Sequence, residues 1–249
     1  MKILISVDIE GVAGVYHTEQ TRPGNAEYER ARLLMAGEAN AAIAGAFDAG
    51  ASAVYVNDSH GSFRNLQPDV LDARAQAIQG KPRYLSMVAG VEQPDVAGVC
   101  MVGYHARAHA AGILAHTINS FAFASVAFNG QPLGEAGIYG ALAGQYGVPV
   151  LMASGDDAFI AETRPLLPWA AYVETKRATG QNSGISLSPA QSCAAIRAGV
   201  VQAMAQREAA RPLALGTLPI TVDLQTQTPA LADLFCQWPS FERQTATAL

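Results

Sequence analysis

The stretch Ile3–Gly14, ILISVDIEGVAG, is an apolar run that ends abruptly in two carboxylates and two glycines. The β-branched and large apolar residues of its first half are typical of a strand that is covered on both faces. Side chains two positions apart on an extended backbone point to the same side, so we expect Asp8 and Glu10 to face one site. Two close carboxylates repel each other unless a cation or a shared proton lies between them. The alternative is that both acids lie on a solvated turn after the strand.

The composition of the 249-residue chain restricts the classes of protein to which it can belong. Hydrophobic residues make up 50% and charged residues 15% of the sequence, and the formal net charge is -5. This balance indicates a substantial core and further apolar surface of the kind that oligomers bury. A nucleic-acid partner is not expected, because the sequence has no basic cluster. The three cysteines lack the C-x-x-C spacing, so neither a disulfide framework nor a thiolate zinc site is indicated.

The sequence also carries expectations about location and domain organisation. No signal-type apolar segment follows Met1, and no uninterrupted apolar run is long enough to cross a membrane. We therefore expect a cytoplasmic protein without a membrane partner. No linker rich in Pro, Gly and Ser divides the chain, which predicts a single domain over residues 1–249, with a smaller carboxyl-terminal subdomain from about residue 165 as the alternative division.

The segments after the first strand alternate between helical and extended patterns. Residues 26–49 are rich in Ala, Glu, Arg, Leu and Met and are followed by Gly50, which predicts a long helix with a glycine stop. Residues 53–57 then form a second apolar strand, and this order favours a parallel pair joined by a right-handed crossover. Further strands are predicted at 83–87, 96–102, 125–128, 148–153, 170–174 and 219–224, and further helices at 138–146, 158–164 and 190–209.

Polar residues with metal-binding side chains follow several of these strands. His60 follows the second strand, His105 follows the strand 96–102, and Glu135 follows the strand 125–128 at the start of a helix. Taken singly, His60 is an exposed turn residue and Glu135 a carboxylate that favours a helix start. Four strands that each present such a residue favour a common site, because ligands bind at the carboxyl ends of strands in an open parallel sheet.

The mixture of imidazole and carboxylate donors suits zinc or a similar first-row metal better than magnesium. Five donors exceed the number that one tetrahedral catalytic zinc with an open position uses. Two metal ions bridged by a carboxylate fit better, and Asp8 is the candidate bridge. The predicted fold is thus α/β, with a mostly parallel central sheet flanked by helices, a metal site at the carboxyl ends of the strands, and a smaller carboxyl-terminal α/β addition.

Five short motifs, in order along the chain, carry a resemblance to a known family. The sequence resembles the zinc-dependent D-aminopeptidase family, first known from a dipeptide-transport operon. The motifs are Ser6–Gly11, Asn57–Gly61, Gly103–Ala106, Leu114–Thr117 and Asn129-Gly130 leading to Gly134-Glu135. A weaker similarity extends to residues 175–180 and 238–243.

The resemblance implies a dinuclear zinc aminopeptidase that removes the amino-terminal D-amino acid from short peptides or amides. It implies two zinc ions per chain, bound by the residues at positions matching the family's ligands: Asp8, which is shared between the ions, Glu10, His60, His105 and Glu135. It assigns a catalytic role, described as nucleophilic, to the position of His116. It also implies a homodecamer with a central channel that admits only small peptides.

The chemistry can also be argued from the residues. Metal-activated water would attack the scissile carbonyl, which the same metals polarise. His116 would stabilise the oxyanion or move a proton to the leaving amine, and we favour this over direct attack by its ring. The alternative for His116 is a satisfied core histidine. His17 and His109 receive no role.

The sequence is also compatible with three other functions. A metal-dependent phosphohydrolase would also gather Asp and His at strand ends, but the sequence has no phosphate-binding G-x-x-x-x-G-K-[ST] run. A metal-dependent amidohydrolase acting on a different small amide would use the same ligands. A non-catalytic metal-binding module would not require His116 beside the ligand set.

Overall fold

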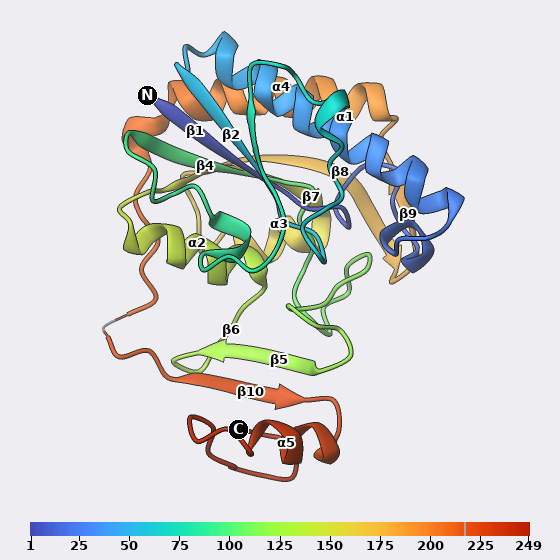
Figure 1. Ribbon diagram of the computed structural model, residues 1–249, viewed down its shortest axis with the longest axis vertical. Helices are drawn as coiled ribbons and strands as arrows, with labels where there is room; N and C mark the ends of the chain where they lie inside the picture. The colour runs from blue at the N-terminus through green and yellow to red at the C-terminus, as the bar shows by residue number, and fades with distance from the viewer. Residues whose placement is uncertain (217) are drawn as a thin grey trace.

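The computed structural model describes residues 1–216 and 218–249, and within them a seven-stranded sheet forms the centre of the molecule (Figure 1). Its strand order is β3-β2-β1-β4-β7-β8-β9, with parallel pairing throughout except between β8 and β9. The strands are β1 (Lys2–Val7), β2 (Ala53–Asp58), β3 (Gln76–Ile78), β4 (Val96–Val102), β7 (Val150–Asp156), β8 (Ala171–Gly180) and β9 (Ser183–Ser186). The predicted α/β class with a mostly parallel sheet is confirmed.

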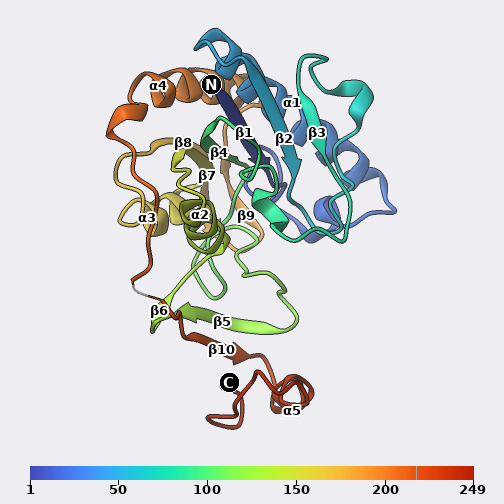
Figure 2. The same cartoon turned by 60° about the vertical axis from the view of Figure 1, so that its left-hand side comes forward.

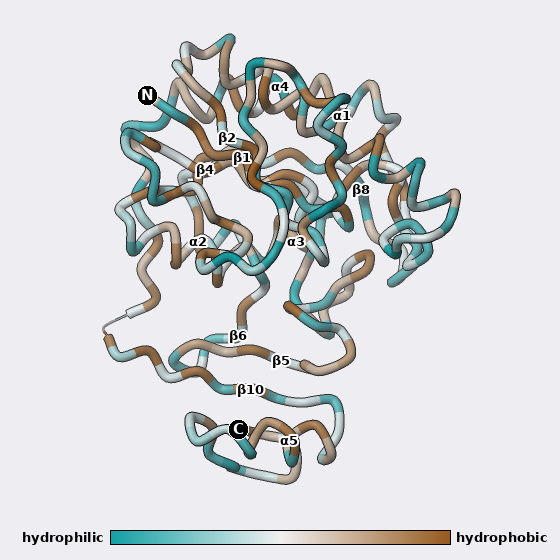
Figure 3. Tube along the Cα trace, in the orientation of Figure 1, coloured by the Kyte–Doolittle hydropathy of each residue, from teal (hydrophilic) through white to brown (hydrophobic). Residues whose placement is uncertain are grey.

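Helices cover both faces of this sheet. α1 (Ala26–Asp48) and α4 (Pro189–Ala205) lie on one face, and α2 (Glu135–Gln145) and α3 (Asp157–Thr163) lie on the other (Figure 1). β1 lies between them, and the side chains of Ile3, Leu4, Ile5 and Val7 are fully buried. The hydrophobic residues are concentrated in the strands that both helical layers cover, as β1, β2 and β4 show (Figure 3). The apolar first half of the opening stretch is thus the central strand of the fold.

The helix boundaries follow local chemistry that the sequence displays. The Asn25 side chain accepts a hydrogen bond from the Tyr28 N–H at 2.9 Å and caps α1. Ser188 caps α4, with Pro189 in the first turn, and Asp156 caps α3 by accepting from the Phe159 N–H at 2.8 Å. α4 ends at Ala205, four residues before the predicted end.

A second, three-stranded sheet of the described residues lies apart from the central one (Figure 2). It contains β5 (Phe123–Phe128), β6 (Gln131–Pro132) and β10 (Val222–Thr226) in the order β10-β5-β6, with α5 (Pro229–Phe235) packed beside it. Residues 125–128 form a strand as predicted, but this strand does not belong to the central sheet. The reason is the Asn129-Gly130 turn, whose two positive φ angles of 51° and 76° close an antiparallel hairpin with β6.

Two other expectations about strands are corrected. Residues 83–87 are not a strand, because the Arg83 guanidinium binds the Asn57 side chain and the Ile78 carbonyl, and residues from Ser86 form the 3-10 helix η3 (Ser86–Val88). The short edge strand β3 was not predicted. The late strand begins at Val222 rather than Pro219. Among the described residues no helix combines the length and apolar character needed to cross a membrane.

Candidate metal centre

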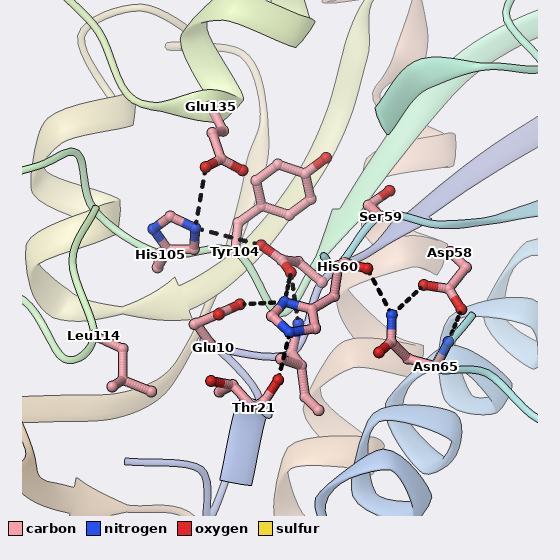
Figure 4. A network of polar contacts seen from close by, with 12 residues as sticks. Glu10, Thr21, Asp58, Ser59, His60, Asn65, Tyr104, His105, Leu114 and Glu135 are labelled. Carbon is pink, nitrogen blue, oxygen red and sulfur yellow. Dashed lines mark hydrogen bonds and ion pairs between the residues drawn. The ribbon is translucent and has the colours of Figure 1, made fainter. Parts of the chain in front are cut away.

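The five predicted ligands meet at the carboxyl edge of the central sheet. Asp8 and Glu10 follow β1, His60 follows β2, and His105 follows β4. Glu135 is the first residue of α2 and enters from beside the sheet, since the strand that precedes it lies in the other sheet (Figure 4). The carboxylates also lie on the turn after β1 and not on extended backbone, so strand alternation is not what aligns them.

His60 lies against the first two carboxylates. Its Nδ1 atom is 3.2 Å from Asp8 Oδ1 and 3.0 Å from Glu10 Oε2. On the opposite side of the ring, Nε2 lies 2.8 Å from the main-chain carbonyl of Thr21. In the neutral imidazole Nε2–H donates to this carbonyl, which leaves the Nδ1 lone pair directed at the carboxylates.

His105 has a similar arrangement with Asp8 and Glu135. Its Nε2 atom is 3.4 Å from Asp8 Oδ2 and 3.6 Å from Glu135 Oε1. Its Nδ1–H donates to the main-chain carbonyl of Ala106 at 3.0 Å. The two oxygens of Asp8 therefore face two different imidazoles, one in each group of ligand atoms.

His116 lies next to this second group. Its ring stacks on that of His105, with 4.0 Å between centroids and 9° between planes. Nδ1 lies 2.9 Å from the Leu114 carbonyl, and Nε2 lies 3.8 Å from Glu135 Oε1. Glu135 is held in turn by the Ile118 N–H at 2.7 Å. The ligand atoms of His105, His116 and Glu135 lie within 4.8 Å of one another, so the geometry places His116 at the edge of the ligand set.

The spacing and the missing hydrogen bonds of the ligand atoms are those expected around a bound cation. Within the described part of the chain, Glu10 Oε2 and His105 Nε2 are buried and have no hydrogen-bond partner. Two ligands on one tetrahedral zinc lie about 3.3 Å apart when the bonds are about 2.0–2.1 Å long. The separations of 3.0–3.6 Å between imidazole nitrogens and carboxylate oxygens match that value. The residues present are therefore suited to hold metal ions.

The electrostatics of the site also favour a bound cation. Burial raises the pKa of Asp8, and the nearby Glu10 carboxylate raises it further. Burial lowers the pKa of His60 and His105, but the nearby carboxylates together outweigh it, Glu10 and Asp8 at His60 and Glu135 and Asp8 at His105, and hold both pKa values well above the usual range. In the absence of a metal the crowded carboxylates thus favour positive charge on the imidazoles.

Two glycines let the ligand-bearing turns approach each other. The Gly11 N–H donates to the Gly103 carbonyl at 2.7 Å. A Cβ atom at Gly11 would lie 1.9 Å from the carbonyl oxygen of Tyr104, which is backbone and cannot swing away. Gly103 has a φ of 71°, and a Cβ there would lie 2.4 Å from the Asp8 carbonyl oxygen. The turn that carries Asp8 and Glu10 and the turn that carries His105 are therefore packed backbone to backbone.

Gly11→Ala is expected to destabilise the protein and to weaken its metal binding, because the added methyl group separates these turns. Overpacking of this kind costs about 1–3 kcal/mol, which corresponds to a Tm lower by roughly 5 °C. Thermal unfolding and metal titration measure the two effects. Gly140→Ala is the matched control, since its Cβ would meet Val150 at an ordinary 3.4 Å. Equal behaviour of the two variants would contradict the close packing.

Two cavities adjoin the ligand set. The smaller, of about 150 Å³, is lined by Asp8 and Glu135 together with Ser59, Phe63, Lys81 and Tyr139. The larger, of about 370 Å³, is lined by Glu10 together with Arg22, Asn119 and Gln181. His60, His116 and Ile118 line both. A molecule bound at the ligand set can therefore extend into either cavity.

Sequence reasoning missed the groups that orient the imidazoles. These are main-chain carbonyls of Thr21, Ala106 and Leu114, and a carbonyl carries no signal in the residue type. Asp58, which belongs to the same motif as His60, lies outside the ligand set. Its carboxylate accepts hydrogen bonds from the Asn65 and Leu66 N–H groups.

Comparisons with known proteins match most or all of this chain. The sequence profile of the family described as D-aminopeptidase matches residues 1–249. A D-aminopeptidase of Bacillus subtilis (strain 168) is 35% identical over 220 residues, which are 88% of this chain and 80% of the relative. The solved structure of the Zn-dependent D-aminopeptidase DppA from Bacillus subtilis, a self-compartmentalizing protease, superposes with a TM-score of 0.95 at 32% identity. That match covers 99% of this chain and 89% of the other.

Proposed function

Because the chain belongs to the D-aminopeptidase family and is a zinc-dependent aminopeptidase, we propose that it uses two zinc ions to release the amino-terminal D-residue of short peptides or amides. One ion is held by Asp8, Glu10 and His60. The other is held by Asp8, His105 and Glu135. The observation that carries this proposal is the division of the Asp8 oxygens, with Oδ1 beside His60 Nδ1 and Oδ2 beside His105 Nε2.

Zinc ions in this position supply a nucleophile at neutral pH, by lowering the pKa of water, and polarise a carbonyl. The chain supplies the orientation of the ligands and the movement of the proton. With the Nδ1–H of His116 on the Leu114 carbonyl, Nε2 is the ring atom that can take up a proton and pass it to the leaving amine. About a fifth of this side chain is exposed, and it lines both cavities, so it can reach a bound substrate.

The two cavities support a substrate with the scissile bond between them. The smaller one provides limited room beside the ligand set, and the larger one, with Arg22 and Asn119, provides room for a polar peptide. This arrangement suits a short peptide.

The proposal includes a homo-oligomer, and by family resemblance a decamer. The DppA structure is that of a self-compartmentalizing protease. In this chain several large aromatic side chains are exposed, with Tyr84 94%, Phe121 76% and Trp238 66% exposed. Apolar surface of this kind is typical of interfaces between copies.

Metal content and hydrolysis of paired D- and L-alanyl amides, measured before and after chelation, test this function. We expect about two zinc ions per chain, release of the D-residue only, loss of activity on chelation and recovery on addition of zinc. Metal without cleavage of either enantiomer would move the function to a different small amide. A protein that stays free of metal in excess zinc would contradict the proposal.

A further inference from the structure

The segment that begins at Thr175 resembles the family but has no part in the ligand set, and it contains a buried lysine. The side chain of Lys176 enters from β8 and is 3% exposed. Its ammonium donates to the main-chain carbonyl of Glu10 at 2.5 Å and to that of Val15. No ion pair of Lys176 occurs among the residues that the structure describes. One cation thus binds both ends of the turn that carries Glu10.

The neighbouring residue binds the same turn. The hydroxyl group of Thr175, fully buried, lies 2.6 Å from the main-chain carbonyl of Gly11 and donates to it. A second carbonyl, of Gly155 on β7, lies 3.1 Å away. Two successive residues of β8 therefore hold two successive carbonyls, at Glu10 and Gly11.

The opposite side of the turn is held by a helix. Glu38 of α1 accepts a hydrogen bond from the Ala13 N–H at 2.9 Å and another from the Ser192 hydroxyl at 2.7 Å. Burial raises the pKa of Glu38 to about 7. The turn between Glu10 and Val15 is thus fixed by buried polar side chains that come from both β8 and α1.

Such an arrangement is costly for folding alone. A buried charge with no carboxylate at ion-pair distance is unfavourable, and burial lowers the pKa of Lys176 to about 8 although Asp156, Glu38 and Glu10 act against it from further away. An apolar side chain of similar length would fill the same space without burying a charge, although the Glu10 and Val15 carbonyls would lose this donor. The hydrogen bonds to the carbonyls provide something that packing cannot, which is a fixed direction for the main chain at Glu10.

We propose that Thr175 and Lys176 are positioning residues of the metal centre, which hold the main chain at Glu10 and Gly11 so that the Glu10 carboxylate meets His60. This inference rests on the proposed function, since it concerns one of the two zinc ions assigned there. Residues that support metal ligands typically change metal affinity by about 10–100-fold when they are lost.

The effect is larger at one ion than at the other. Thr175 and Lys176 share no hydrogen bond or ion pair with His105 or Glu135, which are held by the Ala106 carbonyl and the Ile118 N–H respectively. Loss of the positioning contacts therefore weakens mainly the zinc ion bound by Glu10 and His60, and it reaches the other ion only through the packing of Gly11 against Gly103 and through the shared Asp8.

The test is a zinc titration of metal-free protein against a chromophoric chelator, which resolves the two ions without turnover. Lys176→Met is expected to weaken one zinc by about 10–100-fold and the other by less than about threefold. Thr175→Val, which keeps the shape of the side chain, is expected to weaken the same zinc by a smaller factor. Lys2→Met is the matched control, because Lys2 lies at the opposite end of β1.

Catalysis gives a second readout. In both variants excess zinc is expected to restore kcat, which a general loss of packing would not allow.

Unchanged affinity for both ions in the folded variants would overturn the inference, as would equal weakening of both. Should Lys176→Met fail to fold, Thr175→Val decides alone by the same criterion. A wild type that binds zinc but cleaves no D-alanyl amide would refute the proposed substrate and leave the titration valid. If the wild type binds one ion, unchanged affinity for it would overturn the inference.

Discussion

Replacing Asp8 by asparagine is expected to remove zinc binding and hydrolysis together. Asparagine keeps the shape of the side chain but has one coordinating oxygen and no charge. It therefore cannot bind both the zinc ion beside His60 and the zinc ion beside His105. We expect zinc content to fall from about two ions to fewer than one per chain, and kcat/KM to fall by at least about 10³-fold, or about 4 kcal/mol of transition-state stabilisation.

Stability separates this outcome from misfolding. In the metal-free protein burial and the nearby Glu10 raise the pKa of Asp8 in spite of the two imidazoles, so its ionised form is unfavourable there and a neutral replacement should not lower the Tm below that of the metal-free wild type. Asp48→Asn, at an exposed ion pair with Arg197, is the control for loss of a carboxylate elsewhere. Full activity and full zinc content in Asp8→Asn would refute the proposed site.

Replacing His116 by alanine is expected to slow turnover strongly while zinc remains bound. General acid–base groups typically contribute about 10²–10⁴-fold to the rate, and we expect kcat to fall by that factor with little change in KM. Steady-state kinetics on the D-alanyl amide together with zinc analysis of the same sample measures both quantities.

The outcome also decides among three roles for His116, which are proton transfer, metal ligation and a structural role. Loss of one zinc along with the activity would make His116 a ligand beside His105 and Glu135, with which it shares a cluster of donor atoms. Full activity would make it a structural histidine. His109→Asn is the control, because His109 is exposed and has a φ of 63°, which asparagine tolerates.

Much of the fold follows from local patterns in the sequence. The apolar run of β1, the capped ends of α1 and α4, and the order of strand, helix and strand are visible because they depend on neighbouring residues. The five predicted ligands are brought together for the same reason, since each lies just beyond a strand or at a helix start. Glu135 lies beside the other predicted ligands, but the premise that its preceding strand belongs to the central sheet is wrong, because β5 belongs to the second sheet.

What the sequence could not reveal depends on contacts between distant segments. The partner of the Asn129-Gly130 hairpin is β10, almost a hundred positions further along, and nothing local selects it. The requirement for glycine at position 11 comes from the main chain of Tyr104. Lys176 is an ordinary strand residue until its partner, the Glu10 carbonyl, is known. Pairings of this kind are set by the assembled fold and by backbone groups, which are the same at every position.

The most direct test of the account is the anomalous scattering of zinc in crystals of the zinc-loaded protein. We expect two peaks about 3.5–4 Å apart, the spacing of two-metal sites, on either side of the Asp8 carboxylate. One peak should lie beside Glu10 and His60, and the other beside His105 and Glu135. A single peak, or a pair of peaks away from Asp8, would contradict the shared carboxylate on which the account depends.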